Sequence, residues 1–440
     1  MKENLILDVI GLGINGEGIA KKDGKIFFIP KALENERVEV SLLKEKGNLI
    51  FCKLEKIVKK SKERIESECP YFSKCGGCNF LNLPYEKTIQ FKENLIKDTF
   101  KKIAKLDIQI DEIIRSNRFN YRNKMVFFPF KKDGKFTFGM FEENSHNLVE
   151  IKSCLIAKNE INNVLNICEN YFENNNFNPF DFEKRIGDIK YLTIRIVNNI
   201  PIICIVSPLD IGGRLKGLSS TIQKSYAKFG LWLNINNFKS SEIYSDKFKF
   251  IDGEKEIEEE KLGLKYSVHP YSFMQVNDEV ADKLYEEILK EIENENVINA
   301  YSGAGLLSGI IAKESKRVLG VEINKSASID ADKLKAKNNI KNLTNICGDC
   351  GKVLPKILEN NKENFTLVLD PPKAGVDKKL INAILKNRIE KIIYVACGLT
   401  TLARDINLLK EKYVIEKVKA FDMFANTCNV ETMAVLKLKK

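Results

Sequence analysis

Histidine is nearly absent from this sequence, which has only His146 and His269 among its 440 residues. Two isolated histidines cannot form a multi-histidine metal site, and any catalytic base is therefore expected to be a carboxylate. No apolar run approaches the roughly 18 residues that would span a bilayer. The first residues also lack the basic segment, apolar core and cleavage site of a secretory signal. We therefore expect a cytoplasmic protein with no membrane partner.

Cysteine is present in an odd number, eleven residues spread along the chain. This distribution does not fit a disulfide framework, so we expect a reducing compartment and metal or catalytic roles for some of these thiols. The net charge is +11, and seven lysines against two glutamates lie between Lys44 and Lys62. Such a stretch can attract nucleic-acid phosphates, although a solvated lysine surface fits the charge equally well.

The first 58 residues contain short apolar strands separated by hairpin signals, among them Asn15-Gly16 and Asp23-Gly24. This pattern predicts a small β-barrel over residues 1–58. The segment GLGING within it matches a dinucleotide-binding fingerprint. A second turn and a strand follow the segment, where a dinucleotide site needs a helix, so we reject that interpretation.

The remaining chain divides into two parts by pattern, which gives an α/β protein overall. Residues 59–260 combine a basic amphipathic helix, expected at 86–106, with an irregular mixture of strands and helices, and they predict an α+β central domain. From Val297 onward strands and helices alternate regularly. This alternation predicts a Rossmann-like, doubly wound and mainly parallel sheet over 261–440, with ligands at the carboxyl ends of its strands.

Motifs at the first three strand ends of this sheet favour an adenosyl ligand. AYSGAG places Gly303 and Gly305 where a backbone can approach a ligand closely. Glu322 ends the next strand, where a carboxylate can accept hydrogen bonds from two ribose hydroxyls, and ICGD adds Asp349 at the third. No third glycine stands at dinucleotide spacing, which favours S-adenosylmethionine. The alternative is a tight βα turn with surface acids.

Three later motifs carry groups that suit methyl transfer to a pyrimidine. DPPKAG presents Asp370 on a stiff proline backbone, YVACG presents Cys397, and NVETM presents Glu431 before the last strand. A thiolate that adds to C6 makes C5 a nucleophile toward a methyl donor, and a carboxylate must afterwards remove the C5 proton. Each residue alone is more often structural, but their joint placement predicts Cys397 as the nucleophile and Glu431 as the base.

A metal site is indicated by CPYFSKCGGC, which holds Cys69, Cys75 and Cys78 within ten residues, with Cys154 available as a fourth thiolate. All-thiolate ligation suits a 4Fe-4S cluster or a four-thiolate zinc site. Zinc ribbons usually pair two C-x2-C knuckles, and this segment has one, so we favour iron-sulfur and keep zinc as the alternative.

In their order along nearly the whole chain, these motifs resemble the RNA uridine-C5 methyltransferases, which make 5-methyluridine in transfer and ribosomal RNA. FNYRNKM, SFMQVN and YVACGLTTLARD extend the resemblance. It implies a class I, S-adenosylmethionine-dependent methyltransferase with a TRAM-like N-terminal barrel that binds RNA, a 4Fe-4S cluster on the four cysteines, and a monomeric state. It assigns the same roles to Cys397 and Glu431. It lines the cofactor and uracil sites with Gln275, Tyr301, Glu322, Asp349 and Asp370.

We therefore expect methylation of C5 of a specific uridine in RNA, with ribosomal RNA preferred over transfer RNA. The chain departs from the usual family pattern at Leu306, Lys373, Ala396, Gly398 and Asn429. These departures leave one alternative, a catalytically weak relative that acts as an RNA-binding or RNA-folding factor.

Overall fold

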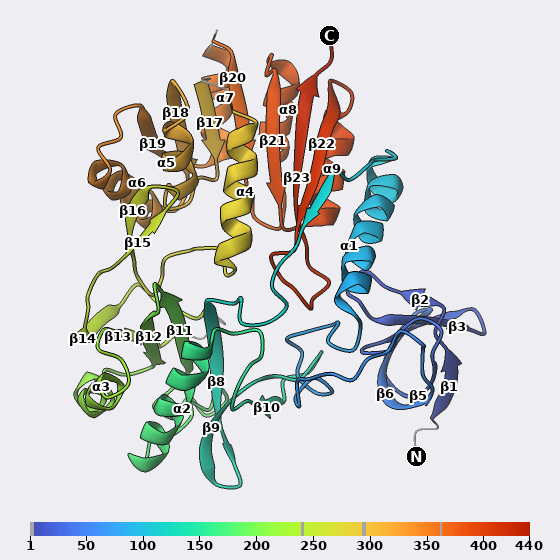
Figure 1. The fold of residues 1–440 in the computed structure, drawn as a ribbon, viewed down its shortest axis with the longest axis vertical. Coiled ribbons are helices and arrows are strands. Elements are labelled where there is room, and N and C mark those ends of the chain that lie inside the picture. The colour runs from blue at the N-terminus through green and yellow to red at the C-terminus, as the bar shows by residue number, and fades with distance from the viewer. Residues whose placement is uncertain (1–3, 239–241, 293–295, 361–362) are drawn as a thin grey trace.

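The computed structural model describes residues 4–238, 242–292, 296–360 and 363–440, which form three large β-sheets and one separate hairpin. In Figure 1 the C-terminal sheet lies at the top, the central sheet lies below it, and the N-terminal sheet lies beside the central one. No helix within the described ranges is long and apolar enough to cross a bilayer.

The N-terminal sheet has six strands in the order β1-β5-β6-β4-β3-β2. Backbone bonds from Val9 to Glu36 and from Ile10 to Ile19 tie the end of β1 back to the rest of the sheet. The sheet therefore curls around its own apolar core, as the predicted barrel requires. GLGING covers β2 and the turn before β3, which confirms that no helix follows it. The strands are β1 (Leu5–Asp8), β2 (Gly11–Leu12), β3 (Gly18–Lys22), β4 (Lys25–Ile29), β5 (Arg37–Lys46) and β6 (Leu49–Lys59).

The central sheet has seven strands in the order β10-β9-β8-β11-β12-β13-β14. Two helices cover one of its faces through a shared apolar cluster. Asp133 and Gly134 both have positive φ angles and form the tight turn between β8 and β9. The strands are β8 (Lys124–Lys132), β9 (Lys135–Phe141), β10 (Leu148–Glu150), β11 (Tyr191–Val197), β12 (Ile200–Ser207), β13 (Gly230–Ile235) and β14 (Phe248–Gly253). The helical segments are α2 (Asn159–Asn174), η2 (Gly212–Leu215) and α3 (Lys216–Gln223).

A hairpin of β15 (Ile257–Lys261) and β16 (Leu264–Val268) lies between the central and C-terminal sheets. Its apolar side chains pack both against the central sheet and against Ile310 and Leu334 on helices of the C-terminal sheet. The boundary expected after residue 260 therefore falls inside a hairpin that both neighbours share.

A segment within the predicted central domain belongs to the C-terminal sheet. It comprises α1 (Tyr85–Thr99), the π-helical turn η1 (Phe100–Ala104) and β7 (Glu112–Ile114), which pairs with the edge of that sheet. Ile96 and Phe100 are fully buried in its core. The division at 59–260 is therefore wrong for this segment, because the apolar face of the helix packs on the C-terminal sheet.

The C-terminal sheet has the strand order β19-β18-β17-β20-β21-β23-β22-β7. The first five of these strands are mutually parallel, and β23 runs antiparallel between β21 and β22. The mainly parallel, doubly wound fold is thus confirmed. The strands are β17 (Asn296–Ala300), β18 (Arg317–Glu322), β19 (Leu343–Cys347), β20 (Phe365–Leu369), β21 (Lys391–Ala396), β22 (Tyr413–Phe421) and β23 (Glu431–Leu438).

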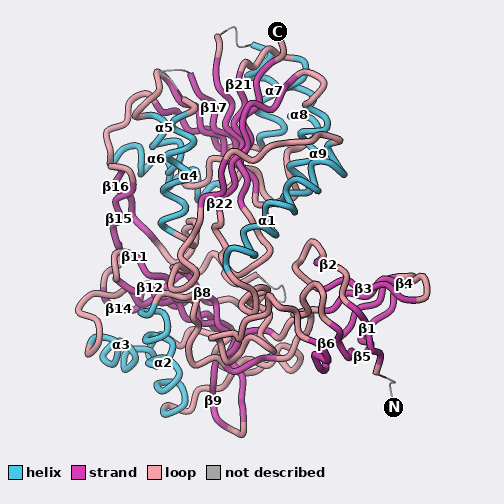
Figure 2. The backbone as a smooth tube through the Cα atoms, turned by 45° about the vertical axis from the view of Figure 1, so that its right-hand side comes forward, coloured by secondary structure: helices cyan, strands magenta, loops and turns pink. Residues whose placement is uncertain are grey.

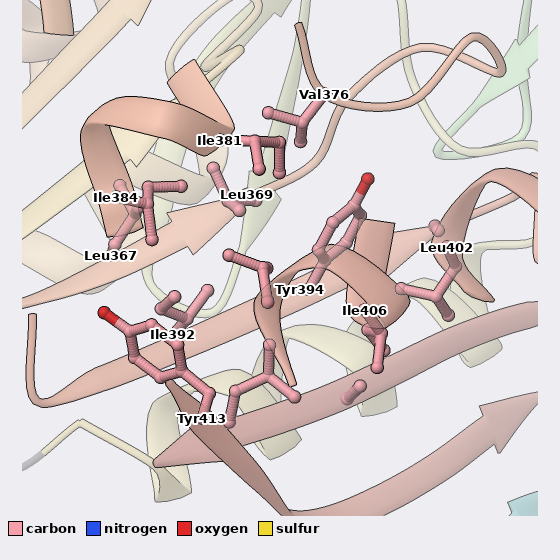
Figure 3. Close-up of a cluster of buried hydrophobic side chains, with 14 of the residues drawn as sticks. Leu367, Leu369, Val376, Ile381, Ile384, Ile392, Tyr394, Leu402, Ile406 and Tyr413 are labelled. Carbon is pink, nitrogen blue, oxygen red and sulfur yellow. The ribbon is translucent and has the colours of Figure 1, made fainter. Parts of the chain in front are cut away.

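Helices cover both faces of this sheet, as Figure 2 shows. Successive side chains of a strand point to opposite faces, so Leu367 and Leu369 join one apolar cluster while Val368 joins another. Figure 3 shows the first cluster, where Tyr394 packs among side chains of α8 and α9. The helices are α4 (Asp278–Lys290), α5 (Leu306–Ala312), α6 (Lys325–Lys337), α7 (Cys350–Asn360), α8 (Lys378–Lys386) and α9 (Leu399–Leu409).

Candidate active site

The predicted catalytic residues meet at the carboxyl edge of the C-terminal sheet. In Figure 1 the arrow of β21 points down, so this edge faces the central sheet. Asp370 directly follows β20 and Cys397 directly follows β21. Because β23 is antiparallel, its first residue, Glu431, also lies at this edge. Ala396 pairs with Thr432, so the next step along the register places Cys397 beside Glu431.

The turn after β17 has a backbone conformation that fits a ligand-binding loop. Tyr301 has a φ of 62°, a left-handed value that is uncommon for a residue with a side chain. At Gly305 an added Cβ would lie 2.6 Å from the Cβ of Ala331, so this glycine permits close packing of α6. At Gly303 an added Cβ would meet no atom within 4 Å. The two glycines thus differ, and Gly303 is the one that leaves room for a ligand.

The side chain of Glu322 holds this turn by hydrogen bonding. Its Oε2 accepts a hydrogen bond from the backbone N–H of Gly303 at 2.9 Å, and its Oε1 accepts one from Asn324 at 2.6 Å. Asp349 lies at the start of α7, where its Oδ1 accepts the N–H of Gly351 at 2.9 Å. Both acids therefore follow strand ends, as the sequence predicted. Each carboxylate, however, already accepts hydrogen bonds from backbone N–H groups.

The loop that carries Asp370 is bound to α9, the helix that follows Cys397. The hydroxyl of Thr401 donates to the carbonyl of Lys373 at 3.1 Å, and Arg404 donates to the carbonyl of Ala374 at 3.0 Å. At Gly398 an added Cβ would lie 2.7 Å from Thr401 Oγ1 and 3.0 Å from the Lys373 carbonyl. A side chain at position 398 would need Thr401 or the Lys373 loop to shift, so glycine suits this packing at one of the positions that depart from the family pattern.

Burial dominates the electrostatics of the three catalytic candidates. Glu431 is 2% exposed, and burial together with the neighbouring charge of Asp370 raises its pKa to about 8. Burial raises the pKa of Asp370 to about 7. The pKa of Cys397 is also raised, first by burial and then by Glu431, while the cation of Lys373 opposes both effects. These four groups share one electrostatic environment, in which a carboxyl group beside Cys397 gains or loses its proton close to neutral pH.

Gln275 lies on the loop between β16 and α4, and its backbone carbonyl accepts a bond from the Asn123 side chain at 3.1 Å. This hydrogen bond holds the backbone of Gln275, and the place of its side chain in the cofactor site stays a prediction. Phe273, two residues earlier, is 78% exposed. An aromatic ring with that exposure can stack on an unpaired base.

The four cysteines of the predicted metal site line a single cavity of about 330 Å³, far from Cys397 in the chain. Phe72 and Met125 contribute apolar walls. Within the described residues, no three His, Cys, Asp or Glu side chains lie close enough together to hold a metal ion. Cys69, Cys75, Cys78 and Cys154 are nevertheless brought together at one cavity, although Cys154 lies far from the other three in the sequence.

Comparison with known proteins supports the resemblance. The family model described as tRNA (uracil-5-)-methyltransferase matches residues 84–439. An uncharacterized RNA methyltransferase of Listeria innocua is 33% identical, covering 99% of this chain and 98% of the relative. Another from Clostridium tetani is 30% identical, covering 98% and 95%. The chain belongs to the tRNA (uracil-5-)-methyltransferase family.

The fold of this RNA methyltransferase agrees with a solved structure of the family. The Pyrococcus abyssi tRNA (uracil-54, C5)-methyltransferase, in complex with S-adenosyl-L-homocysteine, superposes with a TM-score of 0.79 at 23% identity. The match covers 98% of this chain and 99% of that one. The resemblance therefore extends over all three sheets.

One residue in the electrostatic surroundings of the candidate site was missed from the sequence. Tyr285 lies on α4, and the charges of Asp370 and Glu431 add to burial in raising its pKa. Its phenol therefore stays protonated and lies in the field of both carboxylates. No motif marks this residue, and the available signal was its helical spacing from the buried Ala281 and Ile288.

Replacement of Glu431 by glutamine should stabilise the methyltransferase in a pH-dependent way. The folded-state pKa of about 8 lies above the unfolded value near 4.5, so the folding free energy becomes less favourable as the pH rises between them. A neutral glutamine removes this loss, which we expect to be on the order of a few kcal/mol above pH 8. Urea unfolding at pH 5 and pH 8.5 measures the difference, which should be small at the lower pH.

The matched control for this experiment is Glu286→Gln, an exposed position on the same helix as Tyr285. Its stability relative to the parent should not change with pH. An equal gain from Glu431→Gln at both pH values would contradict the raised pKa.

Proposed function

We propose that this enzyme transfers a methyl group from S-adenosylmethionine to C5 of a specific uridine in RNA. The observation that carries the proposal is the register of β21 and β23, which puts the Cys397 thiol beside the buried Glu431 in a member of a uracil-5 methyltransferase family. S-Adenosylhomocysteine in the Pyrococcus abyssi relative supports the choice of donor. Tyr301, Gly303, Glu322 and Asp349 would hold the donor at the neighbouring strand ends.

The first half of the reaction makes C5 nucleophilic. The Cys397 thiolate adds to C6 of uracil, and the electrons of the C5–C6 double bond move into the C4 carbonyl to form an enolate. The enolate carbon C5 then attacks the methyl group, and the electrons of the S–CH3 bond return to sulfur to leave S-adenosylhomocysteine. A thiol with a raised pKa reacts faster as the pH rises, because only its thiolate attacks.

The second half restores the aromatic ring. Glu431 accepts the C5 proton, the C5–H electrons re-form the C5–C6 double bond, and the C6–S electrons return to Cys397. A carboxylate with a pKa of about 8 is a stronger base than an ordinary one, which favours this transfer. Asp370, with its pKa raised to about 7, lies at the same edge and would contact the uracil.

RNA would be held partly by the N-terminal sheet, which we propose is a TRAM-like domain. The lysine-rich stretch identified from the sequence occupies the long strands β5 and β6, where Lys44, Lys46 and Lys53 are exposed. Exposed lysines of this kind contact phosphates without reading sequence. We keep ribosomal RNA as the preferred substrate, although the family description and the Pyrococcus abyssi relative both name transfer RNA.

We also propose a 4Fe-4S cluster at the four cysteines. The four cysteines line one cavity of about 330 Å³ together with apolar side chains, and the single C-x2-C pair in the segment favours the cluster over zinc. When bound, the cluster would supply a rigid cross-link between these segments, because methyl transfer itself requires no electron carrier.

Replacement of Cys397 by alanine should abolish RNA methylation while leaving binding of S-adenosylmethionine nearly intact, since the donor site is built from other strand ends. RNA containing 5-fluorouridine should form a covalent adduct with the parent enzyme and not with Cys397→Ala, because fluorine cannot be removed as a proton. Cys168→Ala, which changes a buried cysteine on α2, is the control. Full methylation by Cys397→Ala would disprove the mechanism.

The RNA target is tested by mapping 5-methyluridine in cells with and without the gene. We expect one or more uridines of ribosomal RNA to lose the methyl group in the deletion strain. Loss confined to transfer RNA would overturn the substrate preference but not the reaction. Unchanged 5-methyluridine in both RNA classes would favour the RNA-binding alternative.

Anaerobically purified protein should contain about four irons and absorb visible light, which zinc cannot do because its d shell is full. Cys154→Ser should lower the iron content and the absorbance. Cys347→Ser, at an exposed cysteine of β19, should change neither. Zinc without visible absorbance would support the alternative metal, and absence of both metals would disprove the site.

A further inference from the structure

The loop between β22 and β23 delivers the base Glu431 to the site. It spans residues 422–430 and is visible in Figure 1 as the dark red segment that projects below the C-terminal sheet. Its residues Asp422, Met423, Ala425 and Asn426 are fully buried. The loop is therefore held by other parts of the chain, and its anchors act together with the pairing of Glu431 and Phe421 to fix where Glu431 lies.

The first half of the loop is anchored by the segment around α1 and by the linker that follows it. Lys92 forms a buried ion pair with Asp422, and Tyr121 donates to the carbonyl of Ala425 at 3.0 Å. Arg118 donates through Nε to the side-chain oxygen of Asn426 at 2.7 Å. These bonds act on residues 422–426, the half that leaves β22.

The second half, which leads to Glu431, is reached by Asn79 from the cysteine segment. The Oδ1 of Asn79 accepts the backbone N–H of Cys428 at 3.2 Å, three residues before Glu431. The backbone N–H groups of Asn79 and Phe80 both donate to the carbonyl of Asn426, at 2.9 and 3.0 Å. Asn79 therefore anchors the part of the loop that lies between the first half and Glu431.

Asn79 also connects this loop to the N-terminal sheet. Its Nδ2 donates to the carbonyl of Asn15 at 3.2 Å. Gly16 packs so closely that an added Cβ would lie 2.6 Å from the ring of Phe80. On the other side of the segment, Lys31 donates to the carbonyls of Cys75 and Cys78. One side chain thus joins the N-terminal sheet, the cysteine segment and the loop of the base.

We propose that Asn79 is a positioning residue for Glu431, acting through the Cys428 backbone, and that it links the cysteine segment to the proton-removal step. The inference rests on the proposed methyltransferase function. A loop released at Cys428 lets the Glu431 carboxylate move away from C5. Nucleophilic attack and methyl transfer do not use this carboxylate, so they continue. Elimination slows, because the C5 proton must leave before the C6–S electrons return to Cys397.

Two variants separate the bonds of Asn79. Asn79→Ala removes both side-chain bonds, while Asn79→Asp keeps an acceptor for the Cys428 N–H and loses the donor to Asn15. Both retain the backbone bonds to Asn426. The assay uses full-length enzyme, S-adenosylmethionine and RNA with an ordinary target uridine, and it follows both methylated RNA release and the denaturation-stable protein–RNA adduct.

With Asn79→Ala, we expect product release to fall roughly three- to tenfold, the factor that loss of one hydrogen bond produces. The adduct, which is scarce with the parent enzyme, should accumulate to a large fraction of the protein. Asn79→Asp should release product at close to the parent rate. Binding of S-adenosylmethionine and iron content should match the parent enzyme in both variants.

Three outcomes would overturn the inference. These are unchanged release with Asn79→Ala, equal slowing of adduct formation and release, or Asn79→Asp behaving like the alanine variant. If Asn79→Ala does not fold, the inference is tested with Asn79→Asp alone. This variant keeps the acceptor for the Cys428 N–H, so accumulation of the adduct in it would contradict the proposed role of that acceptor. Failure of the proposed function is distinguishable, because then the parent enzyme forms no adduct even with 5-fluorouridine RNA.

Discussion

The active site depends on the direction of one strand, β23. The parallel strands β17 to β21 bring their last residues to one edge of the sheet, and a parallel β23 would bring its first residue to the opposite edge. This strand has eight residues, so Glu431 would then lie roughly 25 Å from Cys397. Antiparallel insertion beside β21 instead makes Cys397 and Glu431, the proposed nucleophile and base, neighbours in the register.

That direction creates a long buried loop, which explains much of the surrounding structure. Antiparallel strands are often joined by two residues, but nine lie between β22 and β23. The buried backbone of such a loop needs hydrogen-bond partners, and α1 and the linker after it supply them. The Lys92–Asp422 pair is completely buried, where desolvation offsets most of the Coulomb attraction. Its contribution is to hold the loop in one conformation, while the apolar contacts of Ile96 and Phe100 pack α1 and η1 on the C-terminal sheet.

The sequence predicted the parts of the site that local patterns encode. Apolar runs ending in AYSGAG, DPPKAG and YVACG mark strand ends, and parallel strands bring such ends together. The pattern could not assign α1, because an amphipathic helix shows that one face is buried and not which surface covers it. The hydrogen bond from the Cys428 backbone to the Asn79 side chain joins residues that are 349 positions apart in the sequence. Neither residue belongs to a local pattern that would mark this contact. Such long-range polar contacts follow from tertiary packing and have no local signal.

Two departures from the family pattern lie together on one side of the nucleophile. Gly398 leaves space that Thr401 and the carbonyl of Lys373 occupy, and the Lys373 cation opposes the rise in pKa of both Cys397 and Glu431. Lysine keeps this charge but lacks the planar fork with which arginine binds two oxygens at once. The proposed nucleophile and base are held by the register of β21 and β23. The two departures therefore leave the strand pairing of Cys397 and Glu431 in place, while the charge of Lys373 still acts on both groups.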